Sequence, residues 1–478
     1  MRTPVTVTNP IRGSFRFGTA SESTCRTASF TRRIRPDMPP NVSGMSAPPP
    51  VASKLWLLAA AFLAPLVAGV GVALAVANGP AAGAHWEMLG HVRPAGDYSA
   101  DVEAFRGVAY LSSHRGRDSC KAEGVRAYSL ANPRRPRLLA TFGRIPGTWT
   151  EKTIVRSIRT STYTGDLAAV SVQGCGLADW RGFALYDVSR PARPLELARV
   201  HLDPRGSHEL WLTQAGGRAL VFTASLRSEA LDSPDGVTPG RPDFRIWDVS
   251  DPRAPVQVGA WGAWQELGLK PFPDIRRPLD GNLTHSVVTN AAGTRAYLSY
   301  WDLGTVVLDV SDPSRPVYLG RTAATENAHS AWLGRGGLLL ETHETAGGTV
   351  TLYDVSTPSA PRRLSQLRLS SRLLAAGHRN GGMSVVNGLS LADSVHDPKV
   401  VGTTAYLSWY SQGVVAADVS NPARPRVLAR FLPPAAKDRE SLLCPDRPCS
   451  AVWGVDTSGP YVVASDLNSG LWVLRLRR

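Results

Sequence analysis

A short phrase that recurs six times constrains the fold of this 478-residue chain more than any other feature. Its commonest form is Asp-Val-Ser, then one variable residue, then Pro-x-x-Pro. The copies occupy residues 128–136, 187–194, 248–255, 309–316, 354–361 and 418–425. Their spacing of 45 to 64 residues is typical of a propeller, a solenoid or an array of repeats.

Each copy is predicted to form a turn between two strands. Apolar runs such as 182–186 and 304–308 end directly before it. The Asp side chain can accept hydrogen bonds from backbone N–H groups just beyond itself, which closes an Asx-turn. The second proline opens the following run, and proline cannot donate to a sheet ladder. That following run is therefore predicted to be an edge strand.

Upstream of each phrase lie two more strand candidates, most clearly at 285–289 and 295–300. Four short antiparallel strands per repeat make one propeller blade. Helical periodicity is absent beyond residue 85, so the chain is predicted to be all-β.

Six copies of the phrase give six blades, and the end of the chain gives part of a seventh. Residues 451–456, 461–466 and 470–475 supply three strands. We predict that 86–92 supplies the fourth, because closure by both termini removes an open sheet edge. The prediction is a seven-bladed β-propeller, with six or eight blades as the alternatives.

Residues 304–316 (GTVVLDVSDPSRP) resemble the LVIVD repeat, named for strands of the Gly-Gly-Leu-Val-Ile-Val-Asp-Val-Ser-x-Pro type. The resemblance spans about residues 97–478, although Ala417, Trp247 and Ser129 depart from the pattern in other copies. It implies a bacterial or archaeal β-propeller of a kind that is commonly exported. The repeat is a structural unit, so the resemblance implies no particular activity.

The N-terminal part is predicted to direct export. Residues 1–53 are expected to be a disordered basic leader, with Met45 as an alternative start, and 54–84 a signal peptide or signal anchor. The run 55–77 has no charged residue and is long enough to span a bilayer. Ala82-Gly83-Ala84 offers a small-residue cleavage site, so cleavage and anchoring both stay open.

In either case residues 85–478 are predicted to lie outside the cytoplasm, because the leader and Lys54 place positive charge on the other side. Four of the five cysteines lie in this part. Cys120 and Cys175 fall in equivalent loops of neighbouring blades, and Cys444 and Cys449 bracket a tight loop. Two disulfides are predicted, as suits an oxidising compartment.

Every long insertion is predicted to emerge on one face of the propeller. These are 225–243, between a second and a third strand, and 262–283 and 370–395, between blades. Binding residues concentrate on loops held by a rigid scaffold. Trp264, Trp301 and His343 lie in or beside this face and are predicted ligand-binding residues.

Four histidines occupy the first position of an innermost strand in four consecutive blades, and they are His208, His285, His329 and His396. Imidazoles that converge from different blades could bind zinc, copper or iron. The alternative is structural, since a histidine that recurs at one blade position can simply hydrogen-bond to the neighbouring blade.

No Ser-His-Asp arrangement, P-loop or dinucleotide fingerprint is visible, so no catalytic residue is predicted. The formal net charge is +14, but no basic stripe with interleaved aromatic residues indicates nucleic-acid binding. The leading hypothesis is a monomeric binding scaffold at the cell surface, secreted or membrane-anchored, which holds a protein or a surface polymer through its loop-rich face. The alternatives are a metal-dependent oxidoreductase or hydrolase with a His cluster at the channel mouth, and a purely structural envelope component.

Overall fold

The computed structural model describes residues 73–77 and 83–478, with gaps at 97, 117, 177–178, 227, 272–280, 326, 346, 380–384, 387–388, 391–392, 441, 443 and 445–446. The described residues form one compact unit. The predicted leader and most of the predicted signal segment lie outside the described residues. Within the described part of the chain, no helix combines the length and the apolar character needed to cross a membrane.

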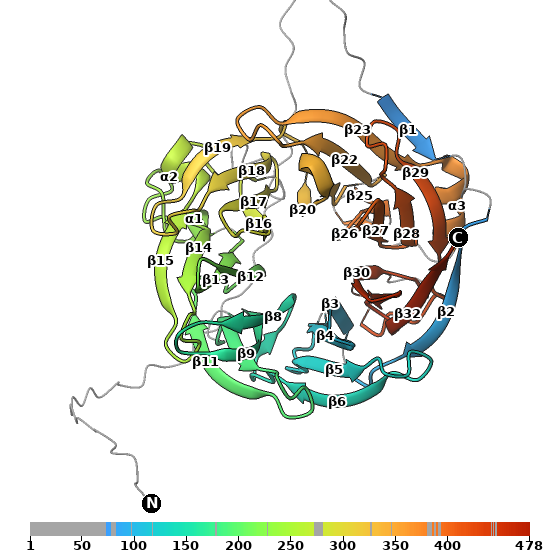
Figure 1. The fold of residues 1–478 in the computed structure, drawn as a ribbon, viewed down its shortest axis with the longest axis horizontal. Helices are drawn as coiled ribbons and strands as arrows, with labels where there is room; N and C mark the ends of the chain where they lie inside the picture. The colour runs from blue at the N-terminus through green and yellow to red at the C-terminus, as the bar shows by residue number, and fades with distance from the viewer. Residues whose placement is uncertain are drawn as a thin grey trace, which may run out of the picture. The chain divides into compact units, whose positions relative to one another are not determined.

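Seven antiparallel sheets surround a central axis, as predicted (Figure 1). Blade 1 contains β3 (Tyr98–Phe105), β4 (Val108–His114), β5 (Val125–Ser129) and β6 (Arg137–Phe142); blade 2 contains β8 (Thr153–Arg159), β9 (Thr164–Gly174), β10 (Gly182–Asp187) and β11 (Leu195–His201), with β7 (Thr148–Trp149) also paired to β9; blade 3 contains β12 (Glu209–Ala215), β13 (Arg218–Ala224), β14 (Phe244–Asp248) and β15 (Val256–Trp261).

Blade 4 contains β16 (Thr284–Thr289), β17 (Arg295–Tyr300), β18 (Gly304–Asp309) and β19 (Val317–Arg321); blade 5 contains β20 (Ala328–Leu333), β21 (Leu338–His343), β22 (Thr349–Asp354) and β23 (Arg362–Leu369); blade 6 contains β26 (Pro398–Val401), β27 (Thr404–Trp409), β28 (Gly413–Asp418) and β29 (Arg426–Phe431); blade 7 contains β30 (Val452–Ser458), β31 (Tyr461–Asp466), β32 (Gly470–Arg477) and β2 (His85–Val92). The first strand of each blade lines the channel and the fourth forms the outer wall (Figure 1).

The ring closes as the sequence predicts. β2 pairs antiparallel with β32, so the two ends of the propeller share blade 7. One edge differs from the prediction, because β1 (Ala73–Ala77) pairs in parallel with β23. The fourth strand of blade 5 is therefore covered, whereas the prediction made it a free edge. β1 holds the last five residues of the predicted apolar run, and export by that run stays a prediction.

The repeated phrase forms the predicted Asx-turn. The Asp309 carboxylate accepts a hydrogen bond from the Ser311 N–H at 2.8 Å, and Asp418 and Ser420 repeat the contact at 2.9 Å. The valine of the phrase is buried, and the Val310 N–H donates to the Thr294 carbonyl in the turn between the first two strands. The phrase thus ties both turns of a blade together.

Neighbouring blades pack closely at the outer wall. A Cβ atom added to Gly259 of β15 would lie 1.9 Å from the carbonyl oxygen of Pro313, in the turn of blade 4. A Cβ atom added to Gly320 of β19 would lie 2.3 Å from that of Pro358 in blade 5. Both neighbours are backbone atoms, so only glycine fits at these positions.

The insertions contain helices that the sequence analysis did not predict. These are α1 (Ser228–Leu231), α2 (Ala263–Leu267) and α3 (Ser371–Arg379), and a small hairpin of β24 (Val385–Val386) and β25 (Leu389–Ser390) follows α3. A 3₁₀ turn, η1 (Arg335–Gly337), lies outside the insertions, between β20 and β21. Helices of this length are too short to show a clear 3.6-residue pattern. In an antiparallel blade, loops between second and third strands and loops between blades leave the same face. α1, α2 and α3 therefore lie on one face, as predicted for the insertions.

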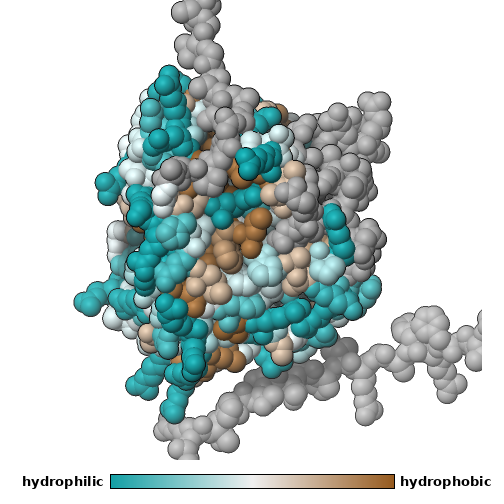
Figure 2. Space-filling model, turned by 90° about the vertical axis from the view of Figure 1, so that its right-hand side faces the viewer, coloured by the Kyte–Doolittle hydropathy of each residue, from teal (hydrophilic) through white to brown (hydrophobic). Residues whose placement is uncertain are grey.

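Both predicted disulfides are present. Cys120 pairs with Cys175, which links the equivalent loops of blades 1 and 2, and Cys444 pairs with Cys449 before blade 7. Seen from the side, hydrophilic residues cover much of the outer wall and smaller hydrophobic areas lie between them (Figure 2).

Candidate functional site

Seven aromatic rings, one from each blade, form a closed circle at the channel mouth. In order around the axis they are His114, Trp149, His208, His285, His329, His396 and Trp453. Consecutive ring centroids lie between 4.0 and 6.2 Å apart. The four histidines predicted to share one arc of the channel do so, and His114 with two tryptophans completes the circle.

The strand pattern explains how these side chains converge. His285 and His329 are the second residues of β16 and β20, while His208 and His396 stand just before β12 and β26. The first strands of all blades begin on the loop-rich face, so equivalent positions meet in one layer. Trp301, in the connection between β17 and β18, lies against this layer, with its ring 5.0 Å from His285.

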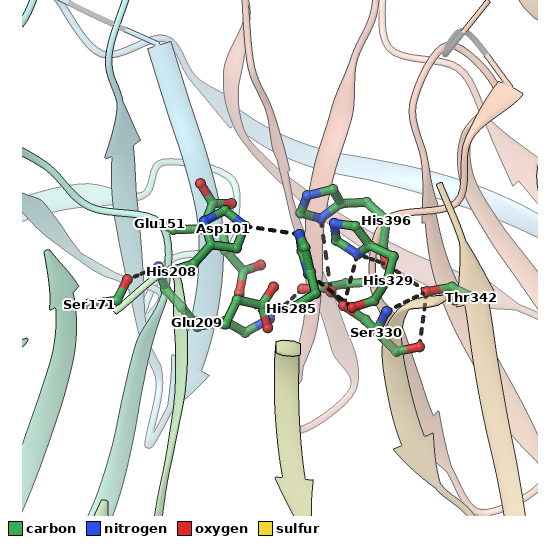
Figure 3. A network of polar contacts seen from close by, with 12 residues as sticks. Asp101, Glu151, Ser171, His208, Glu209, His285, His329, Ser330, Thr342 and His396 are labelled. Atoms are coloured by element: carbon green, nitrogen blue, oxygen red, sulfur yellow. Dashed lines mark hydrogen bonds and ion pairs between the residues drawn. The ribbon is translucent and has the colours of Figure 1, made fainter. Parts of the chain in front are cut away.

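The imidazoles are joined in one hydrogen-bonded chain (Figure 3). The Nε2 atoms of His208 and His285 lie 3.0 Å apart. His285 Nδ1 is 3.0 Å from the carbonyl oxygen of His329, and His329 Nδ1 is 3.0 Å from that of His396. Because a carbonyl only accepts, both Nδ1 atoms carry the proton and both Nε2 atoms carry a lone pair. His208 Nε2 then donates to His285, and the Gln173 amide donates to His208 Nδ1.

Burial keeps these imidazoles neutral. It lowers the pKa of His208 to about 3 and that of His114 to about 4. Burial likewise holds the pKa values of His285, His329 and His396 well below the usual value, and neighbouring imidazoles add to the effect at His285 and His329. Neutral imidazole is the form that binds metal ions.

A single lysine lies at the centre of the next layer. The ammonium group of Lys152 lies 3.1 Å from Asp101, 3.3 Å from Glu209 and 2.6 Å from Asp397. These carboxylates come from blades 1, 3 and 6, so the lysine joins opposite walls of the channel. Burial opposes its charge, yet the three carboxylates hold the pKa of Lys152 well above the usual value.

The carboxylates do not share this cation equally. Although burial opposes it, Lys152 holds the pKa of Asp397 below its usual value. Burial raises the pKa of Asp101 to about 7 and that of Glu151 to about 8, and it raises the pKa of Glu209 well above its usual value. The layer around Lys152 therefore contains more carboxyl groups than this single cation can keep ionised.

Some buried polar atoms in these layers have no hydrogen-bond partner within the described part of the chain. They are Glu209 Oε1, Glu151 Oε2 and His396 Nδ1. Buried polar groups are nearly always satisfied. A small cavity of about 30 Å³ adjoins the lysine and is lined in part by Lys152, Trp211, Trp332 and Lys399. The candidate site consists of the aromatic circle and the layer around Lys152.

The three predicted ligand-binding residues, Trp264, Trp301 and His343, lie in different elements of the fold. Trp264 is buried in α2, with 7% of its surface exposed. His343 is buried at the end of β21, 3.5 Å from Glu341. Of the three, Trp301 contacts the imidazole chain. Ligand binding by these residues stays a prediction.

The sequence analysis missed Trp149, Trp453 and the central role of Lys152. Lys152 and Trp453 stand on the first strands of blades 2 and 7 or directly before them, as the histidines do in blades 3 to 6. Comparison by strand position, rather than by residue type, would have found both.

Comparison with known proteins bears on the fold. A family model described as the LVIVD repeat matches residues 291–323, which contain β17, β18 and β19. The chain is a β-propeller that contains an LVIVD repeat. The match covers a single repeat, and the other blades follow from the structure. A comparison with curated proteins finds no match.

Solved structures are similar to the LVIVD-repeat propeller at low sequence identity. One is the crystal structure of Chaetomium thermophilum Raptor, with 11% identity over 82% of this chain and 29% of Raptor, at a TM-score of 0.49. Another is the computationally designed Ika8 protein, with 8% identity over 81% of this chain and 99% of Ika8, at a TM-score of 0.45.

Proposed function

We propose that residues 85–478 act outside the cytoplasm as a binding scaffold, which holds a protein or a surface polymer through the loop-rich face. One observation carries the proposal, namely that the insertions with α1, α2 and α3 and both disulfides lie on this face. On the opposite face the described connections between strands are short turns, one of which contains η1. A rigid ring with elaborated loops on one side is suited to recognition.

The loop between β13 and β14 is held in place before any partner binds. The Glu229 carboxylate accepts a hydrogen bond from the Trp264 N–H, and the Gln265 amide donates to the Gly240 carbonyl. The Asp235 carboxylate accepts from the Val237 N–H at 2.8 Å. A loop that is already ordered loses less conformational entropy when it binds.

Two apolar side chains on this loop are open to a partner. Leu231 is 46% exposed and Val237 is 66% exposed. The outer strands offer matched controls, because Leu195 on β11 is 59% exposed and Val256 on β15 is 58% exposed. The two pairs have the same chemistry and similar exposure but lie on different surfaces.

The test compares two double variants of the immobilised full-length chain in capture from a cell-envelope extract. Leu231→Ser with Val237→Ser should lower recovery of a captured component at least tenfold, which corresponds to about 1.4 kcal/mol of binding free energy. Leu195→Ser with Val256→Ser should leave recovery unchanged. Equal recovery by both double variants would contradict binding through the loop-rich face.

The extracytoplasmic location has its own test. Cells are lysed in an alkylating reagent, and the four cysteines of the propeller are then examined by mass spectrometry. We expect Cys120, Cys175, Cys444 and Cys449 to be unmodified until the protein is reduced, because disulfides persist in oxidising compartments. Full alkylation without prior reduction would place the propeller in the cytoplasm.

A further inference from the structure

The layer around Lys152 contains more carboxyl groups than basic groups. Asp101, Glu209 and Asp397 surround Lys152. Their side chains are buried, with exposed fractions of 6%, 3% and 8%. When all four groups are ionised, their net charge is −2. An isolated buried charge is costly unless it is paired, and one divalent cation would compensate this excess.

Three side chains beside this excess have the geometry of a metal site. A carboxylate oxygen of Glu209 and one ring nitrogen from each of His285 and His329 lie within 4.8 Å of one another. All three residues are buried, with 3%, 4% and 1% of their surfaces exposed. They come from three consecutive blades, whose first strands fix their positions.

The surrounding contacts prepare these side chains to bind a metal. The Nδ1–H groups of His285 and His329 donate to backbone carbonyls, which is how metal-binding histidines are usually oriented. This tautomer leaves a lone pair on each Nε2, and at His285 a metal would replace the hydrogen bond from His208. Glu209 Oε1 is buried and has no hydrogen-bond partner within the described residues. The imidazole chain explains the positions of the histidines but does not explain this orphaned oxygen.

We propose that Glu209, His285 and His329 bind one divalent transition-metal ion at the channel mouth. Two imidazoles and one carboxylate suit zinc, which catalytic sites often hold with His₂Glu, and also iron(II). An all-oxygen set would suit magnesium or calcium instead. The proposal narrows the predicted four-histidine site and adds Glu209 to it.

A second group of His329, His396 and Asp397 also lies within 4.8 Å, but its carboxylate is already engaged. Asp397 Oδ1 accepts a hydrogen bond from the Ser330 hydroxyl at 2.5 Å, and Oδ2 lies 2.6 Å from Lys152 Nζ. Binding a metal there would break both contacts of the carboxylate. In the first group a metal would replace the His208–His285 hydrogen bond, but Glu209 Oε1 has no hydrogen bond to lose among the described residues. His208 is partly exposed and lies next to His285, so it marks the side from which an ion can enter.

The experiment uses the full-length chain, purified without chelator, stripped with a chelator and then titrated with Zn²⁺ or Co²⁺ alone. We expect one equivalent of Zn²⁺ by mass spectrometry, and Co²⁺ absorption bands of a nitrogen and oxygen site. Glu209→Gln removes the charge and keeps the shape. His285→Asn keeps a donor near Nδ1 and removes Nε2. Each variant should bind at least about tenfold more weakly.

His114→Asn is the matched control, because His114 belongs to the same aromatic circle but lies outside the proposed ligand set. It should retain one equivalent. Zn²⁺ should also raise the unfolding temperature of the wild type and of His114→Asn but not that of Glu209→Gln, which separates loss of the site from loss of the fold. Absence of stoichiometric metal in the wild type, or equal occupancy in the wild type and both ligand variants, would overturn the proposal.

Discussion

Substitution of Glu229 by Gln should stabilise the protein at neutral and alkaline pH. Glu229 is 1% exposed and belongs to α1, where its carboxylate faces Trp264 of α2. Burial, reinforced by the charge of Asp243, raises its pKa from 4.5 to about 9. Geometry supports this raised pKa, because Glu229 Oε1 and Gln265 Oε1 lie close together. They lie 1.6 and 2.0 Å from the position that a Cβ atom on Gly262 would occupy. Neither oxygen has a hydrogen-bond partner within the described residues, and a proton on Glu229 would satisfy both.

The sign follows from proton binding. Between pH 4.5 and about 9 the unfolded carboxyl has lost its proton and the folded one keeps it, so stability falls as pH rises. One proton changes the free energy of unfolding by about 1.4 kcal/mol per pH unit, which gives about 4 kcal/mol between pH 5 and pH 8. Glutamine stays neutral, and its amide can donate to Gln265 while its oxygen accepts from Trp264. The variant should therefore lose this slope.

The assay is denaturant unfolding, followed by tryptophan fluorescence, at several pH values from 5 to 8. Glu266→Gln is the control, because Glu266 is an exposed residue on the neighbouring helix α2. We expect the curve of free energy against pH to be flatter for Glu229→Gln and unchanged for Glu266→Gln. Parallel curves for the wild type and Glu229→Gln would refute the inference that Glu229 is protonated when the protein is folded.

Three further predictions concern the scaffold and the channel. Gly320→Ala should lower the free energy of unfolding in denaturant by about 1–3 kcal/mol, because the new Cβ atom would lie 2.3 Å from the Pro358 carbonyl oxygen. An unchanged midpoint would show that the two blades can separate there. Serine substitution of Cys120 and Cys175, which are 55 residues apart, should lower the free energy of unfolding by about 4 kcal/mol on the chain-entropy model. The same substitution of Cys444 and Cys449, which are 5 residues apart, should lower it by about 2 kcal/mol. Equal losses would contradict that model. Lys152→Met should lower the free energy of unfolding by about 3–5 kcal/mol, because it leaves three buried carboxylates without their cation. The loss should be smaller at pH 5, where those carboxylates are protonated more easily. Equal losses at pH 5 and pH 8 would contradict this explanation.

Most of the fold could be predicted because its determinants are local and recur. The aspartate and valine of the phrase act within their own blade, as the Asp309 and Val310 contacts illustrate. The proline that opens each fourth strand places that strand at the edge. β1 could not be predicted in the same way, because its pairing with β23 joins segments almost 300 residues apart and depends on no repeated signal.

The candidate site was predicted only in part, since residue type and strand position carry different information. His208, His285, His329 and His396 could be grouped because they share both. Lys152 shares only the position, and its significance lies in distances to carboxylates from three other blades. No pattern along the chain reports such distances, since they depend on the closure of the ring.

The energetics of the channel mouth favour a binding role over a purely structural one. Buried ion pairs contribute little net stability, and well-packed apolar residues often replace them without loss. The same channel shows that such residues fit, because Val288 and Trp332 line the next layer. Lys152 and its three carboxylates are therefore not needed to fill the channel, and Glu209 Oε1 lacks even the hydrogen bond that a structural role would supply. A chain selected for stability alone would gain by replacing this layer as a whole, whereas a chain that must attract a cation would keep its excess of carboxylates beside neutral imidazoles.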